Sequence, residues 1–178
     1  MPDLSLTHRM SAYTAWADDV MLKTAQQLSE AELSAPRDAL FKSIAGTFDH
    51  TLVVAEMFKA HLLGNNHSHT ARHRPEALPF SEVAQRLRSM NDYYVSLARE
   101  WTNAELAEVI TFQFVGGGEG QMTREDILLH LANHATYHRG FVSTLLFPLK
   151  TKGSASDLTV FLRDVWPDMA AKIKETGQ

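Results

Sequence analysis

Three histidines spaced four residues apart are the feature of this sequence that most directly indicates chemistry. They are His130, His134 and His138, within the stretch HLANHATYHRG. Imidazole nitrogens bind divalent metal ions and transfer protons near neutral pH. In an α-helix, a spacing of four residues places two side chains about 40° apart on one face. His134 and His138 could therefore bind one ion together.

The helix that should carry these histidines runs from Thr123 to about Phe147. Thr123 suits the N-cap position, Asp126 suits the return hydrogen bond of a capping box, and Pro148 should end the helix. The imidazoles at 134 and 138 fall in the middle of its apolar arc, so we expect them to face the interior of a bundle. The apolar residues of this arc are Ile127, Leu131, Phe141, Val142 and Leu145.

A second expected helix carries His50 in an equivalent inward position. Ser43 is a suitable N-cap for this helix, and Gly64 is a suitable residue just beyond its C-terminus. The side chains that surround His50 on the helical wheel are apolar, so a third imidazole should point into the same core. These neighbours are Val53, Val54, Met57 and Phe58.

Three inward histidines on two helices favour a shared metal ion. One such histidine is more often a core residue with a single hydrogen-bond partner than a ligand. Three of them would leave several buried nitrogens without partners, and one divalent ion would satisfy them together. We therefore predict a metal site at His50, His134 and His138. Ala135 follows the first histidine of the pair, so the HExxH motif of zinc proteases is absent.

Other residues are expected to have supporting roles at this site. His130 lies about 12 Å from His138 along the helix axis, so we expect it to contact one of the metal-binding histidines rather than to bind the same ion. Tyr13 and Trp16 should be core aromatics, although the Tyr13 hydroxyl could also contact one of the metal-binding histidines. A carboxylate, Asp49 or Asp126, could close the open position of the metal.

The remaining histidines are expected outside the site. His61 faces inward but lies three turns, roughly 16 Å, beyond His50. His67, His69 and His73 belong to a polar loop with two prolines, NNHSHTARHRPEALP, and should be solvated.

Two more helices and a short extended segment complete the pattern. A helix is expected from Leu6 to Leu28, with Ser29 as the cap of a short turn after it. Another should run over residues 80–101 with Ser81 as its cap, because its apolar residues alternate in steps of three and four. Residues 109–122 should form a strand-like or turn segment, since Ile110, Phe112 and Phe114 alternate with polar residues before three glycines.

Length and composition predict one domain of ordinary globular type. The 178 residues are 44% hydrophobic and 21% charged, with a net charge of −4 and no cysteine. We expect a single domain over residues 1–178, with a core at about 8–146 and short helices in the tail 147–178. The acidic balance argues against nucleic-acid binding, and the absence of a long apolar run argues against membrane insertion. Without an apolar leader, the expected location is cytoplasmic.

The stretch NHATYHRG resembles the N-H-x-x-x-H-R-G signature of the DinB/YfiT-like superfamily. The segments YTAWADDVMLKTAQQLSEAEL and SIAGTFDHTLVVAEMF are similar to the first two helices of that family. The resemblance covers about residues 8–146. It implies an all-α four-helix bundle with a long crossover, often a homodimer, with metal ligands at His50, His134 and His138. Within the signature, Arg139 should form an ion pair or hydrogen bond, and Gly140 should permit close helix approach.

The resemblance also implies a type of activity. Characterised relatives include bacillithiol S-transferases and a mycothiol-dependent maleylpyruvate isomerase. A metal-dependent S-transferase is therefore expected, with a low-molecular-weight thiol as co-substrate and a small electrophile as substrate. Zinc or nickel is the expected metal, with iron, cobalt or manganese as alternatives. Two other interpretations stay open: a metal-dependent hydrolase, and a bundle that binds a metal or small ligand without catalysis.

Overall fold

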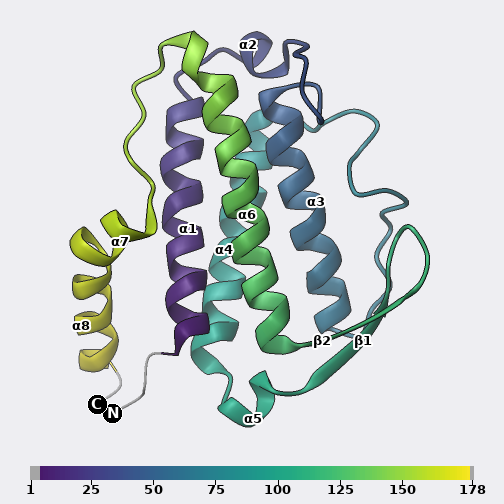
Figure 1. Cartoon of the computed structure of the whole chain (residues 1–178), viewed down its shortest axis with the longest axis vertical. Helices are drawn as coiled ribbons and strands as arrows, with labels where there is room; N and C mark the ends of the chain where they lie inside the picture. The colour runs from purple at the N-terminus through teal and green to yellow at the C-terminus, as the bar shows by residue number, and fades with distance from the viewer. Residues whose placement is uncertain (1–4, 177–178) are drawn as a thin grey trace.

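Four long helices form the body of the molecule in the computed structural model, which describes residues 5–176 (Figure 1). Helices α1 and α3 each pack against both α4 and α6, so the core lies between the four helices. The prediction of an all-α four-helix bundle is confirmed. The four helices are α1 (Leu6–Ala25), α3 (Ile44–Leu62), α4 (Phe80–Glu100) and α6 (Arg124–Leu146).

A long crossover joins α3 to α4. In Figure 1, α1 and α6 run upward while α3 and α4 both run downward, so residues 63–79 must return along the outside of the bundle. This segment contains no helix or strand of its own. The crossover implied by the family resemblance is therefore present, and it passes beside α3, the helix that carries His50.

Local capping explains where the helices that carry the histidines begin. At α6, Thr123 and Asp126 form the predicted capping box. At α3, the Ser43 hydroxyl accepts the Gly46 amide, and Gly64 follows the helix at φ +65°, as predicted.

The predicted cap of α4 is wrong, because this helix begins one residue before Ser81. Pro79 occupies the N-cap position and offers no side-chain hydrogen bond. The Phe80 amide donates instead to Glu30 Oε1 at 2.8 Å, so a distant carboxylate satisfies the helix start.

Short elements link the long helices. The extended segment before α6 is an antiparallel hairpin, β1 (Val109–Gln113) and β2 (Glu119–Thr123), so the sequence indicated only its first strand. Gly117 and Gly118 form its turn at φ +91° and +93°, which residues with a side chain rarely adopt. The first helix ends at Ala25 rather than Leu28. Two short helices also lie between the long ones: α2 (Glu30–Ser34), whose Ser29 cap was predicted, and α5 (Asn103–Leu106).

The C-terminal tail folds back along α1. It contains the 3-10 helix η1 (Phe147–Leu149), then α7 (Leu158–Asp164) and α8 (Trp166–Thr176). Phe161 is fully buried between the tail and α1. The single domain over residues 1–178 stays a prediction, and its first four and last two residues lie outside the described part. No helix of that part is long and apolar enough to cross a bilayer.

Candidate metal centre

Three imidazoles from two helices meet at one point in the bundle. His50 of α3 lies with its Nε2 atom 3.1 Å from His134 Nε2 and 3.1 Å from His138 Nε2 of α6. All three nitrogens lie within 4.8 Å of one another. His50 and His138 are buried, and His134 is half-buried. The structure therefore brings together the three residues that the sequence selected.

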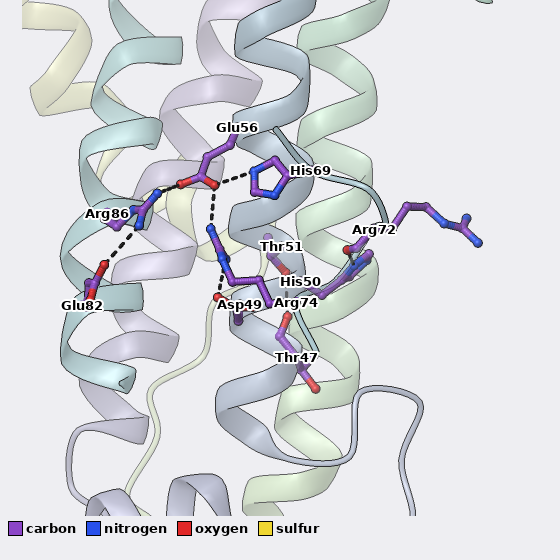
Figure 2. Close-up of polar contacts among 10 residues, drawn as sticks. All are labelled: Thr47, Asp49, His50, Thr51, Glu56, His69, Arg72, Arg74, Glu82 and Arg86. Atoms are coloured by element: carbon purple, nitrogen blue, oxygen red, sulfur yellow. Dashed lines mark hydrogen bonds and ion pairs between the residues drawn. The ribbon is translucent and has the colours of Figure 1, made fainter. Parts of the chain in front are cut away.

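A backbone carbonyl fixes which nitrogen of His50 carries the proton. His50 Nδ1 lies 2.6 Å from the carbonyl oxygen of Arg72, in the crossover (Figure 2). A carbonyl oxygen can only accept a hydrogen bond, so Nδ1 must carry the hydrogen. Neutral His50 then presents a bare Nε2 lone pair to the other two imidazoles. Metal-binding histidines commonly have such a partner on the nitrogen that does not bind the ion.

The geometry of the triad fits a divalent ion better than a hydrogen-bonded cluster. The Nε2 atom of His50 has one lone pair, yet two ring nitrogens lie at 3.1 Å from it. Only one of them can donate well to that lone pair. Two nitrogens that bind zinc tetrahedrally at about 2.0–2.1 Å are about 3.3 Å apart, close to the separation found here. An ion would use all three lone pairs at once.

Burial keeps the three imidazoles neutral, which is the form that binds metal. Desolvation, with help from His138 and His50, lowers the pKa of His134 to about 3. Desolvation and His50 lower the pKa of His138 to about 4. The pKa of His50 is also lowered, mainly by burial. At neutral pH all three rings therefore offer lone pairs without prior loss of a proton.

Phe41 forms an aromatic wall of the site, which the sequence did not indicate. Its ring stacks on His50 with centroids 3.9 Å apart and planes 13° apart, and its edge meets His138 at 5.5 Å. The carbonyl of Phe41 lies so close to Gly46 that a Cβ there would be 2.2 Å from its oxygen. Glycine at position 46 therefore permits the loop before α3 to lay Phe41 over the histidines.

A buried ion pair sets the orientation of α6. Arg139 Nη1 lies 2.7 Å from Asp18 Oδ1 of α1, with both side chains almost inaccessible. Asn91 of α4 donates to the other Asp18 oxygen at 2.9 Å. The predicted ion pair of Arg139 is confirmed. The helical wheel places Arg139 on the arc opposite the apolar residues, yet Arg139 is buried, because α6 packs against α1 as well as α3 and so buries a wider arc.

Two predictions about the face of α6 are wrong. Gly140 does not permit a close helix approach, because a Cβ added there would meet no atom within 4 Å. Phe141, placed in the inward arc by the helical wheel, is 39% exposed. Both residues lie on the side of α6 that no other long helix covers.

Of the two residues expected to support the triad, His130 lies beside it and the Tyr13 hydroxyl does not point to it. The centroid of the His130 ring lies 5.8 Å from that of His134 and 4.9 Å from that of Phe58, so His130 is a neighbour of the triad, and its supporting role stays a prediction. The Tyr13 hydroxyl donates to the Ser156 carbonyl in the tail, away from the triad.

Neither candidate carboxylate closes the site. Asp49 pairs with Arg74, and Asp126 accepts the backbone amide of Thr123 at the start of α6. Among the described residues, the three histidines are the only group of potential ligands that converges in this way.

The histidines of the crossover are less solvated than predicted. His69 lies 2.9 Å from Glu56 of α3 with 16% of its side chain exposed. His67 is half-buried beside His61, whose ring stacks on Phe112 of the hairpin. Only His73 is exposed as expected. The crossover therefore packs onto α3 and the hairpin.

A small cavity adjoins the triad inside the bundle. His134 forms part of its mostly apolar wall, together with five polar residues from the other three long helices. Its volume of about 30 Å³ suits one or two water molecules rather than a substrate. The five polar residues are Ser11, Thr14, Asp18, Thr51 and Asn91.

The fold and the triad together define a helical bundle with one candidate metal centre held between α3 and α6. Comparison with known families agrees with this class: residues 1–166 match the model of the DinB family, and the chain belongs to that family. Protein DinB of Bacillus subtilis (strain 168) is 21% identical over 163 residues, which are 86% of this chain and 92% of that protein.

Solved structures support the same fold. A DinB-like protein from Bacillus cereus is 22% identical with a TM-score of 0.59, over 81% of this chain and 91% of that one. A conserved protein from Enterococcus faecalis is 17% identical with a TM-score of 0.55, over 81% of this chain and 98% of that one. At sequence identities of 17% and 22%, these two structures show that the fold is shared.

Proposed function

We propose that His50, His134 and His138 bind one divalent metal ion and that the protein is a metal-dependent enzyme. The observation that carries this proposal is the single lone pair of His50 Nε2, which faces two further ring nitrogens at 3.1 Å. Nitrogen ligands of this kind favour zinc or nickel over magnesium or calcium. Iron, cobalt and manganese are the alternatives that metal analysis would distinguish.

An open coordination position supports catalysis rather than a structural role. Structural zinc sites are usually closed by four protein ligands, whereas catalytic sites have three and an exchangeable position. The two carboxylates predicted as a possible fourth ligand, Asp49 and Asp126, are held by Arg74 and by the α6 cap. The triad is thus a three-ligand set.

The proposed reaction is transfer of a low-molecular-weight thiol to a small electrophile. A bound divalent ion lowers the pKa of a thiol or water that reaches it. The chain has no cysteine, so the thiol must come from solution. In the overall reaction a carbon–sulfur bond forms at the electrophile. With a haloaromatic, halide leaves and the thiol proton is released; with an epoxide, a carbon–oxygen bond breaks and the thiol proton ends on the new hydroxyl. Membership of a family with thiol-dependent members supports this choice.

His130 is the side chain that we assign as the proton acceptor in this reaction. Burial lowers the pKa of His130, so its ring is neutral near pH 7 and able to accept the thiol proton. The small cavity beside His134 has room for about one or two water molecules, so the electrophile is expected to approach the triad from another side. The Tyr13 hydroxyl is not assigned a part, because it donates to Ser156.

The test compares thiols and metals in one assay. Glutathione, bacillithiol and mycothiol would each be offered with a haloaromatic or an epoxide, using protein loaded with zinc or nickel. The proposal expects metal-dependent turnover with at least one thiol, and loss of that turnover in His138→Ala. It fails if no thiol accelerates the reaction and if the visible spectrum of cobalt-loaded protein is unchanged by thiol. Hydrolysis of an ester by the same sample would then favour a hydrolase.

The proposed assembly is a cytoplasmic homodimer. Exposed aromatic residues support it: Tyr137 is 59% and Phe147 is 87% exposed, on α6 and just beyond it. Large exposed apolar groups of this kind often belong to protein interfaces. Light scattering on the purified protein should give about twice the chain mass of 19.9 kDa. A monomer at micromolar concentration would contradict the dimer.

A further inference from the structure

The carbonyl that fixes the His50 tautomer belongs to a segment with no regular structure. Arg72 lies in the crossover of residues 63–79, and its side chain is exposed and extends away from His50 (Figure 2). A loop of this length without secondary structure usually has a function or moves freely. The hydrogen bond to His50 can persist only if something holds this part of the crossover against α3.

Arg74, two residues further along, provides that attachment. Its Nη1 atom contacts Asp49 Oδ1, and its Nη2 atom lies 2.8 Å from Glu56 Oε2 (Figure 2). Asp49 and Glu56 are seven residues apart, two turns of α3, so they share one face of the helix. Only 17% of the Arg74 side chain and 2% of the Asp49 side chain are exposed. One planar guanidinium thus links the crossover to two carboxylates.

Further contacts strengthen the attachment at Glu56 and Asp49. Glu56 also lies 2.9 Å from His69 Nε2 of the crossover, and it contacts Arg86 of α4. The backbone amide of Leu78 donates to Asp49 near the end of the crossover. The crossover is therefore fastened to α3 at three of its own residues, on both sides of Arg72.

Asp49 directly precedes His50 on α3. Asp49, which pairs with Arg74, and His50, which contacts the Arg72 carbonyl, are thus consecutive residues of one helix. Loss of the Arg74 contact would loosen the Arg72 carbonyl relative to His50 Nδ1, because Arg74 is the attachment closest to Arg72 in sequence, while Asp49 and His50 would keep their places on the helix. The ion-pair cluster therefore has a direct geometric link to the triad.

We propose that Arg74 is a positioning residue of the metal centre: by clamping the crossover to Asp49 and Glu56, it holds the Arg72 carbonyl against His50 Nδ1 and so directs the His50 Nε2 lone pair at the metal. This inference rests on the proposed metal site. Residues that hold the outer nitrogen of a ligating histidine typically change metal affinity by about 10–100-fold when they are lost.

The first measurement concerns the protein without metal. In chain labelled with 15N-histidine and treated with chelator, the ring nitrogen shifts of His50 report which nitrogen is protonated. The wild type should show hydrogen on Nδ1. Arg74→Met should show a mixture of both tautomers, because the carbonyl is no longer held. A His50 that stays fully Nδ1-protonated in Arg74→Met would overturn the proposal.

The second measurement is zinc affinity by competition with a chelating dye. Arg74→Met should bind at least about tenfold more weakly than wild type. Arg74→Lys should fall between them, since an ammonium cannot bridge both carboxylates as a guanidinium does. Arg86→Met is the matched control: it removes a partner of Glu56 that is not in the crossover, and it should bind zinc like wild type. Equal weakening by both Met variants would overturn the proposal.

A second variant covers the case in which Arg74→Met does not fold. That change leaves the buried Asp49 carboxylate without its partner, so Arg74→Met with Asp49→Asn removes the charge as well. The folded double variant should show the same tautomer mixture and weakened zinc binding. A wild-type tautomer there would overturn the role of Arg74. Wild-type protein could fail to bind zinc and the other proposed divalent ions while the His50 tautomer still changes in Arg74→Met. The proposed metal site would then be wrong, and the role of Arg74 in fixing the His50 tautomer would still be supported.

Discussion

Arg139 and Asp18 form a buried ion pair that joins α6 to α1 across 121 positions of the chain. Arg139 follows His138 directly, and Asp18 receives a further hydrogen bond from Asn91 of α4. One pair thus connects three of the four long helices at the level of the triad. Removal of either partner would leave the other charge buried and unpaired.

We predict that Asp18→Ala lowers the free energy of unfolding by about 3–5 kcal/mol, the cost of an unpaired buried charge. Urea unfolding followed by circular dichroism would measure it. Arg163→Ala is the control, since Arg163 pairs with Asp164 on the surface with 74% of its side chain exposed. It should unfold like wild type. A similar small effect of both variants would show that the buried pair is unimportant.

Two glycines should respond in opposite ways to alanine. Gly46→Ala should destabilise the protein by about 1–3 kcal/mol, because its Cβ would overlap the Phe41 carbonyl and push the Phe41 loop away from His50. Gly140→Ala should stabilise it by about 0.5–1 kcal/mol, because the position is helical and a Cβ meets open space. Thermal unfolding of both variants tests this, and the reverse order of stabilities would contradict the described packing.

Acid should destabilise the metal-free protein. The folded-state pKa values of His134 and His138 are lowered to about 3 and about 4, below the ordinary value of 6.5. At pH values below 6.5 and above the lowered pKa values, these histidines bind protons in the unfolded chain and not in the folded chain. The free energy of unfolding therefore falls as the pH decreases from about 6.5. The slope should be at most about 1.4 kcal/mol per pH unit for each histidine.

Urea midpoints between pH 7 and pH 4, with chelator present, would measure this dependence. A variant with glutamine at both positions, His134→Gln with His138→Gln, is the control, because glutamine does not titrate. Its stability should vary less with pH over the same range. Equal slopes for the two proteins would mean that these histidines titrate normally in the folded state.

The parts of the fold that follow helical periodicity were predictable from the sequence. A period of 3.6 residues places His50, His134 and His138 in the middle of the apolar arcs of their helices, and capping residues such as Ser43 and Thr123 mark where helices begin. The convergence of the three rings follows once α3 and α6 are neighbours.

The parts that depend on irregular segments were not predictable. Phe41, Arg72 and Arg74 reach the site from loops, in which spacing along the chain indicates no common face. Arg72 contributes a backbone carbonyl, which its side chain does not reveal. The burial of Arg139 and the exposure of Phe141 were not predicted for a different reason: a helical wheel centred on one stripe does not show how many neighbouring helices a helix has.

Metal content is the measurement closest to the proposed site, in which His50, His134 and His138 hold one divalent ion. Untagged protein would be measured by elemental analysis beside single alanine variants of the three histidines and of His73, an exposed histidine of the crossover. We predict one divalent ion per chain in the wild type and in His73→Ala, and strong loss of metal in each of the three triad variants. Metal that remains in the triad variants, or a wild-type protein that binds none when supplied with zinc, nickel, iron, cobalt or manganese, would show that the three histidines are not a metal site.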